Sequence, residues 1–377
     1  MSLFLNPLTL HVKLKKSLTR YLVTRSAISS AYLKEEIKRQ LLEEGTITKS
    51  PYLQLLKEYE KSVKLEDVSF NGRKILHPNF KSVVNQNVEK RKGFRVDTEL
   101  FIHQEEAIRN AYNGQNVIVA SGTGSGKTEC FLIPIINRLL NEPRPAGLKG
   151  VRCVILYPMN ALVNDQIKRI KEWLGIAEQD DHAIKFAYYT SKTPNQPKSE
   201  NLDKDYFNEL KYRTEIRETS PDILVTNYSM LSYILMRPSD RKLFDNALSM
   251  IVLDEAHIYS GALATEIRLL IHHLALRCRL ISKHLQFFLT SATLTSDIDS
   301  EEQQKNILRE FAGKLTNIHS TSWTAILSKS FIQQSNHINK NEEIGKLIES
   351  ARLIQKIVGD KFEEDFEFSA IEDDLKN

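Results

Sequence analysis

Short apolar runs alternate with helix-like segments from residue 93 to about 315, and this alternation constrains the fold more than any other feature. Strands buried on both faces of a parallel sheet have such continuous, β-branched composition, and the intervening segments have the length and polarity of helices. The sequence therefore predicts one doubly wound α/β domain. The runs are "NVIVA" (116–120), "CVILY" (153–157), "IKFAYY" (184–189), "DILVT" (222–226), "MIVLD" (250–254) and "QFFLT" (286–290).

The flanking regions have a different texture. Residues 1–92 are predicted to be a helical accessory region. In that region "AYLKEEIKRQLLEEG" has helical spacing and ends at Gly45, and "SPYLQLLKEYEKSV" begins with Ser50 as N-cap and Pro51 at the first helical position. Residues 316–377 are predicted to hold the helix "NKNEEIGKLIESARLIQKIVG" and an acidic tail, as a linker or a truncated region. We expect the strands to stop near residue 315.

The segment "ASGTGSGKT" (120–128) lies between a predicted strand and a predicted helix. It fits the phosphate-loop pattern G-x-x-x-x-G-K-[ST], except that Ser121 replaces the first glycine. Backbone N–H groups of such a loop surround phosphate oxygens, Lys127 can reach the β- and γ-phosphates, and the Thr128 hydroxyl can ligate Mg²⁺. The alternative is a glycine-rich turn without a ligand. The predicted nucleotide-binding residues are Gly122, Thr123, Gly124, Ser125, Gly126, Lys127 and Thr128.

The segment "IVLDEAH" (251–257) ends an apolar run with two acids. In a parallel sheet, ligands bind at the carboxyl ends of the strands. We expect Asp254 to hold Mg²⁺ and Glu255 to polarise the water that attacks the γ-phosphate. A single Asp-Glu pair after a strand is often only the solvated start of a helix. A phosphate loop earlier in the same alternating domain makes ATP hydrolysis the stronger interpretation.

These motifs, in this order, resemble those of superfamily 2 helicases of the DEAD/DEAH type. The finer motif style is similar to that of large bacterial helicases such as MrfA and Druantia DruE. The resemblance implies that residues 93–315 form one RecA-like lobe. It rests on "FIHQEEAI" (101–108), like the glutamine-bearing segment; "SGTGSGKT", like motif I; "YPMNALVNDQ" (157–166), like motif Ia; "TNYSML" (226–231), like motif Ib; "DEAH", like motif II; and "SAT" (291–293), like motif III.

The resemblance also implies roles for single residues. Gln104 would read the adenine, and Lys127, Asp254, Glu255 and His257 would form the catalytic set. His257, Ser291 and Thr293 would couple the ATP site to the nucleic-acid surface. Polar residues in loops after strands would bind a nucleic-acid phosphate backbone without reading its sequence; they are Gln166, Thr190, Thr193 and Thr226. For each of these four, the alternative is an ordinary N-cap or turn residue.

Composition limits the protein class less sharply. The net charge of +4 neither requires nor excludes nucleic acid. No apolar run approaches the roughly 18 residues of a membrane span, and Cys130, Cys153 and Cys278 form no C-x-x-C pair. We expect a cytoplasmic protein with free thiols, without a membrane partner or a cysteine metal site.

The leading hypothesis is the motor lobe of an ATP-dependent DNA helicase or translocase that uses ATP and Mg²⁺. Bacterial antiphage defence and DNA repair, with the corresponding partner proteins, are both compatible. A superfamily 2 motor needs a second RecA-like lobe with arginine fingers. We expect this lobe from a longer protein or another subunit, and expect the chain alone to bind ATP but hydrolyse it slowly and not unwind. The alternatives are a non-unwinding ATP-dependent switch that docks partner proteins through its N-terminal helices, and an RNA helicase.

Overall fold

The computed structural model describes residues 7–26, 28–43, 45–49, 58–85, 94–122, 124–144, 150–176, 183–196, 206–278, 285–292 and 300–331. The chain forms two compact units, one of residues 1–58 with 332–377 and one of residues 59–331. The predictions for residues 50–57 and for the C-terminal helix and acidic tail fall outside the described residues. No helix that the structure describes has both the length and the apolarity needed to cross a membrane.

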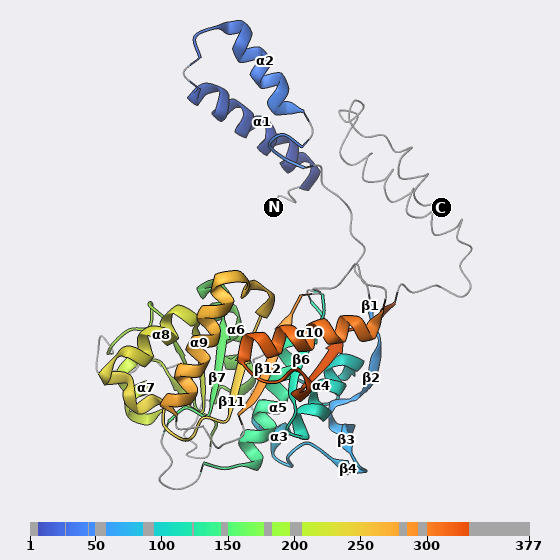
Figure 1. Ribbon diagram of the computed structural model, residues 1–377, viewed down its shortest axis with the longest axis vertical. Coiled ribbons are helices and arrows are strands. Elements are labelled where there is room, and N and C mark those ends of the chain that lie inside the picture. Colours follow the sequence, from blue (N-terminus) through green and yellow to red (C-terminus); the bar gives the residue numbers. More distant parts are fainter. Residues whose placement is uncertain are drawn as a thin grey trace, which may run out of the picture. The chain divides into compact units, whose positions relative to one another are not determined.

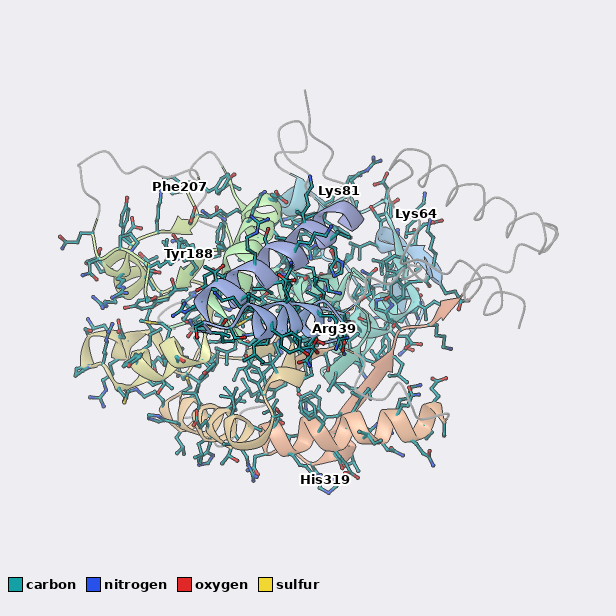
Figure 2. The ribbon with its side chains drawn as sticks, turned by 90° about the horizontal axis from the view of Figure 1, so that it is seen from above. Arg39, Lys64, Lys81, Tyr188, Phe207 and His319 are labelled. Atoms are coloured by element: carbon teal, nitrogen blue, oxygen red, sulfur yellow. The ribbon has the colours of Figure 1, made fainter. Side chains whose placement is uncertain are left out.

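The first unit contains a helical pair, α1 (Pro7–Arg25) and α2 (Ala31–Leu42), that pack together. Ser30 caps α2 because its side chain accepts a hydrogen bond from the Leu33 N–H at 3.4 Å. α2 carries exposed ion pairs, including that of Arg39, which Figure 2 labels, with Glu36 at 2.6 Å. The helix predicted in "AYLKEEIKRQLLEEG" is confirmed, but it ends at Leu42, with Glu43 as its C-cap, and not at Gly45.

The second unit is built on an eight-stranded parallel sheet with the order β13-β6-β12-β11-β7-β10-β8-β9 (Figure 1). All six predicted strands are confirmed, and their continuous apolar composition is explained by burial on both faces. The strands are β6 (Asn116–Ala120), β7 (Cys153–Tyr157), β8 (Phe186–Tyr189), β9 (Glu209–Leu210), β10 (Ile223–Asn227), β11 (Met250–Leu253), β12 (Gln286–Ser291) and β13 (Trp323–Leu327).

Helices cover both faces of this sheet, because alternate strand residues enter two separate cores. Val117 and Val119 of β6 face the first core, and Ile118 faces the second. The first core is covered by α3 (Phe80–Asn85), α4 (Ile102–Tyr112), α5 (Lys127–Asn141) and α6 (Asn160–Leu174). The second is covered by α7 (Arg213–Thr219), α8 (Tyr228–Met236), α9 (Gly261–Arg277) and α10 (Glu301–Thr316). This is the predicted doubly wound arrangement.

Two predictions about the edges of this unit are wrong. The helix predicted over "SPYLQLLKEYEKSV" is instead extended where the structure describes it, as β1 (Glu58–Tyr59) and β2 (Lys61–Lys64). β2 pairs antiparallel with β5 (Glu99–Phe101), and this tertiary pairing outweighs the local helical spacing. A short hairpin of β3 (Ser69–Phe70) and β4 (Arg73–Lys74) follows.

The strands also do not stop near residue 315. β13 pairs in parallel with β6 along its whole length, and β14 (Ser330–Phe331) pairs with β1. The run "WTAIL" is as long as β6 and β7, but Thr324 interrupts its apolar residues, and serines flank it at 322 and 328. Its position at the edge of the sheet, which local pattern does not encode, makes it a strand.

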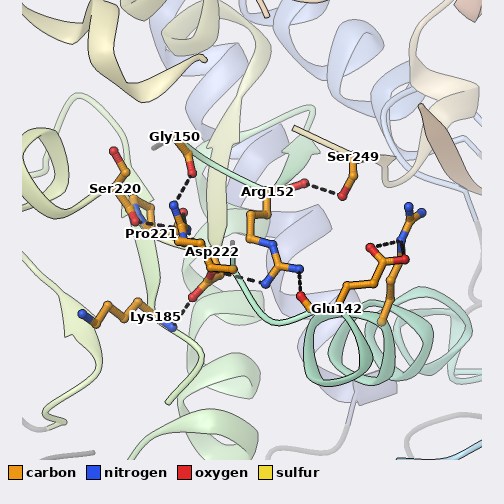
Figure 3. Close-up of polar contacts among 10 residues, drawn as sticks. Glu142, Gly150, Arg152, Lys185, Ser220, Pro221, Asp222 and Ser249 are labelled. Atoms are coloured by element: carbon orange, nitrogen blue, oxygen red, sulfur yellow. Dashed lines mark hydrogen bonds and ion pairs between the residues drawn. The ribbon is translucent and has the colours of Figure 1, made fainter. Parts of the chain in front are cut away.

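The amino ends of β7, β8 and β10 are tied together by Asp222 (Figure 3). One carboxylate oxygen accepts the Lys185 N–H at 2.9 Å, and the other pairs with Arg144 at 2.9 Å and Arg152 at 3.7 Å. The Asp222 carbonyl also accepts the Cys153 N–H at 2.8 Å. This network holds together the amino edge of the sheet, which is opposite to the carboxyl edge where the motif segments lie.

Candidate nucleotide-binding site

The predicted motifs meet at the carboxyl edge of three neighbouring strands. The phosphate loop follows β6, the "SAT" segment follows β12 and the "DEAH" segment follows β11, in the strand order β6-β12-β11. A pocket of about 470 Å³ lies there. Its walls include predicted residues from four separate segments: Gln104, Gly124, Ser125, Gly126, Lys127, Thr128, Gln166, Asp254 and Glu255.

The phosphate loop is held in shape by its serines as well as its glycines. Ser121 is buried, its hydroxyl lies 2.6 Å from the Ser125 hydroxyl, and its N–H donates to the Ser291 carbonyl at 3.1 Å. Ser125 in turn donates to the Gly122 carbonyl at 2.9 Å. Gly126 has φ of +73°, in the left-handed region where a side chain is strained. Ser121 therefore replaces the first glycine of the pattern with a hydrogen bond across the loop.

Lys127 begins α5 and connects the loop to the "DEAH" segment. Its ammonium Nζ lies 3.1 Å from Glu255 Oε1 and 3.3 Å from Oε2, and the two side chains are only 10% and 24% exposed. The Thr128 hydroxyl donates to Gln166 Oε1 at 3.4 Å. The cation expected to meet phosphates thus already faces an anion, beside a helix N-terminus that favours negative charge.

Asp254 is a buried carboxylate that lines the same pocket as the loop. Burial raises the pKa of Asp254, while a hydrogen bond from the Thr290 hydroxyl acts in the opposite direction. The same hydroxyl accepts the Glu255 N–H at 3.1 Å. Glu255 has φ of +49° and ψ of +46°, a strained conformation for a residue with a side chain, of the kind found at functional sites.

Thr290 therefore orders both acids, and the motif search missed it. It is the last residue but one of β12, immediately before "SAT". A polar residue that ends an otherwise apolar run, beside a recognised motif, was the available signal.

His257 and Ser291 both hydrogen-bond to the backbone of Ala292 in the "SAT" segment. The Ala292 N–H donates to His257 Nδ1 at 3.2 Å. His257 Nδ1 also lies 3.4 Å from Glu255 Oε2. The Ser291 hydroxyl donates to the Ala292 carbonyl at 2.7 Å. The "DEAH" and "SAT" segments thus form one hydrogen-bonded unit beside the pocket. Thr123 and Thr293 lie outside the described residues.

Gln104 lies at the pocket, but both ends of its amide have partners in the protein. Its Oε1 accepts the Phe101 N–H at 2.9 Å, and its Nε2 donates to the Gly126 carbonyl at 3.1 Å. The preceding His103, which the sequence search did not single out, donates from Nε2 to the Ser125 carbonyl at 2.9 Å. Burial lowers the pKa of His103, which favours the neutral ring. The start of α4 therefore holds the phosphate loop at two carbonyls.

The residues predicted to bind nucleic acid lie in two places. Gln166 lies in the nucleotide pocket beside Thr128. Thr190, Thr193 and Thr226 lie together after β8 and within β10, and all three are buried. The Thr193 hydroxyl accepts the Thr190 N–H at 2.9 Å and donates to the Tyr188 carbonyl, and Thr226 donates to the Tyr189 carbonyl at 2.6 Å. These contacts match the turn-residue alternative, and a nucleic-acid role for the four residues stays a prediction.

The pocket suits a nucleotide with Mg²⁺. Within the described parts of the chain, no group of three or more His, Cys, Asp or Glu side chains is placed to hold a metal. Mg²⁺ commonly binds with one or two protein oxygens, the remaining ligands being phosphate oxygens and water. Thr128 and Asp254, both at the pocket, offer such a set. Phe94 and Phe101, which also line the pocket, offer aromatic surface suited to a base.

Comparison with known proteins places the same segments in one family. Druantia protein DruE of Escherichia coli (strain UMEA 4076-1) is 29% identical in an alignment that is 404 residues long. The alignment covers 82% of this chain and 21% of DruE. The uncharacterized ATP-dependent helicase MJ1574 of Methanocaldococcus jannaschii is 26% identical, over 67% of this chain and 33% of its own length. The chain thus spans a fifth to a third of these relatives.

Among solved structures, the DUF1998 helicase MrfA bound to DNA matches with a TM-score of 0.47 and 19% identity. This match covers 77% of this chain and 36% of MrfA. The family model described as DEAD/DEAH box helicase matches residues 102–300, more than half of the chain, from α4 through the "SAT" segment. This match includes the phosphate loop, the "DEAH" acids and the residues that join them around the pocket, so the chain belongs to the DEAD/DEAH box helicase family.

Proposed function

We propose that this chain is the ATP-binding motor lobe of an ATP-dependent DNA helicase or translocase. The observation that carries the proposal is the Lys127–Glu255 pair, 3.1 Å apart, between the phosphate loop and the "DEAH" segment above the buried Asp254. A structural ion pair would not need a glycine-rich loop, a helix N-terminus and two strand ends at one pocket. An ATPase needs all of these.

The residues have distinct proposed roles in hydrolysis. The loop N–H groups and Lys127 bind the phosphates, while Thr128 and Asp254 hold Mg²⁺, which supplies charge neutralisation at the phosphate oxygens when bound. As Lys127 turns from Glu255 to the phosphates, the Glu255 carboxylate becomes able to orient the attacking water and accept its proton. His257 then passes the state of Glu255 to the "SAT" segment through the Ala292 N–H.

The wider assignment rests on family likeness. We propose DNA as the substrate, because the motifs are similar to those of large bacterial DNA helicases. A second RecA-like lobe, in cis or in trans, would supply the arginine fingers. The likeness to DruE supports antiphage defence as the setting, with DNA repair as the other candidate. The three cysteines are unpaired and buried, as expected for a protein of the reducing cytoplasm.

The test is nucleotide binding and hydrolysis by the 377-residue chain with Lys127→Ala. We expect affinity for a fluorescent ATP analogue to fall at least about tenfold, because a buried cation that faces the phosphates is lost. The matched control is Lys81→Ala, which removes an exposed lysine of α3 (Figure 2). Equal affinity of Lys127→Ala and the unmodified chain would contradict the proposal. Stimulation of ATPase activity by RNA but not by DNA would contradict DNA as the substrate and point to RNA.

A further inference from the structure

Tyr59 lies against the phosphate loop although it is far from it in sequence and is not a lining residue of the nucleotide pocket. Tyr59 ends β1, which pairs with β14. The next residue, Glu60, donates its N–H to the Lys329 carbonyl at 3.2 Å and accepts the Ile102 N–H at 3.0 Å. The backbone around Tyr59 is thus fixed both to the segment between β13 and β14 and to the start of α4.

The contact with the loop is at Gly122. A methyl group on Gly122 would lie 2.6 Å from the Tyr59 hydroxyl oxygen and 4.0 Å from its Cζ. Both atoms found within 4 Å of that methyl group, in the described chain, belong to Tyr59. The backbone does not itself require glycine here, since Gly122 is absent from the positive-φ glycines that include Gly124 and Gly126. Glycine at this position therefore leaves the space that the Tyr59 hydroxyl occupies.

The Tyr59 ring cannot easily turn away. Its centroid lies 5.5 Å from that of Phe101 and 5.6 Å, edge-on, from that of His103. Phe101 and His103 are themselves stacked at 5.7 Å. His103 also donates to the Ser125 carbonyl. The Tyr59 ring therefore packs against a side chain that holds the phosphate loop at Ser125.

We propose that Tyr59 is a positioning residue for the phosphate loop, which it supports at Gly122 from outside the pocket. The inference rests on the proposed function, since it assigns how that same loop is held for nucleotide. Ser121 is fixed by β12, Ser125 by His103 and Gly126 by Gln104, and Tyr59 completes this support at Gly122. It also links the loop to the β1–β14 pair, so a displacement of these strands changes the shape of the ATP site.

The test is a rescue experiment on the 377-residue chain, with Mg²⁺ and a fluorescent ATP analogue. Gly122→Ala is expected to weaken binding about tenfold, because the methyl group meets the hydroxyl of a packed ring. Tyr59→Phe alone is expected to weaken binding by about twofold to threefold, because the hydroxyl that lies against Gly122 is lost while the ring remains, and the double variant is compared with it. The double variant Gly122→Ala/Tyr59→Phe recovers binding, because the nearest remaining ring atom is 4.0 Å away.

The matched control is Tyr112→Phe, which removes the hydroxyl of an exposed tyrosine and should not rescue Gly122→Ala. A loss of affinity that Tyr59→Phe does not rescue, or the absence of any loss in Gly122→Ala, overturns the inference. Should Gly122→Ala fail to fold, Tyr59→Ala is the second variant: it removes the ring and is expected to weaken nucleotide binding, and unchanged affinity overturns the inference. Binding by the unmodified chain and its loss in Lys127→Ala show separately whether the proposed function holds.

Discussion

Glu255→Gln tests whether the Lys127–Glu255 pair opposes nucleotide binding while Glu255 serves hydrolysis. The Lys127 ammonium lies 3.1 Å from the Glu255 carboxylate. Phosphates that bind the loop must draw Lys127 away from this partner and come close to the Glu255 charge. Glutamine keeps the shape of the side chain and removes both obstacles, so we expect tighter binding and slower hydrolysis from one substitution.

The magnitude follows from the geometry of the pair. Two unit charges at 3.1 Å attract by about 1.3 kcal/mol in bulk water and by about 5 kcal/mol at an effective dielectric constant of about 20. Side-chain exposures of 10% and 24% place the pair between these limits. Desolvation of both charges offsets much of the attraction, which leaves about 1–2 kcal/mol. ATP affinity should therefore rise about tenfold in Glu255→Gln.

The assay is a titration with a fluorescent ATP analogue, followed by single-turnover hydrolysis with radiolabelled ATP. Loss of a general base lowers the hydrolysis rate by about 100-fold or more. Glu266→Gln is the matched control, because Glu266 is an exposed carboxylate on α9 away from the loop. Unchanged or weaker binding in Glu255→Gln would refute the competition, and unchanged hydrolysis would refute the role of Glu255.

Two further predictions concern buried carboxylates. Burial raises the pKa of Asp254 in the folded chain above its value in the unfolded chain. Protonated Asp254 therefore contributes to the stability of the folded chain at acid pH, and this contribution is lost as the pH rises through the raised pKa. Asp254→Asn should thus raise the Tm, measured without nucleotide, by a few degrees near neutral pH and by less at acid pH. The same substitution should abolish Mg²⁺-dependent hydrolysis. A lower Tm at neutral pH would contradict the reasoning. Asp240 is fully buried and accepts from Arg217 at 2.6 Å and from the Tyr189 hydroxyl at 3.0 Å. Asp240→Ala leaves both donors without this acceptor and should cost about 3 kcal/mol in urea unfolding, whereas a loss well below about 1 kcal/mol would mean that the pair is solvated.

The central strands and the position of the site could be predicted from the sequence for a local reason. Strands buried on both faces need continuous apolar side chains, and this composition is visible without any partner strand. Asp254 and Glu255 come at the end of one such run, and Lys127 ends the loop that follows another, so the carboxyl edge of the sheet was expected to collect them. The extension of the sheet by β13 and the strands near residue 60 escaped prediction, since edge strands depend on pairing more than on composition.

The sequence by itself determined the α/β class, the strand ends that carry the phosphate loop and the acids, and the family to which the motifs belong. Only the tertiary structure decided how these residues are held. Ser121 bonds to Ser125, Thr290 orders Asp254 and Glu255, and Tyr59 reaches Gly122 across more than sixty positions of chain. The reason is physical. Spacing along a chain determines which face or edge a side chain occupies, but the partner that it meets there depends on strand order and on packing between distant segments.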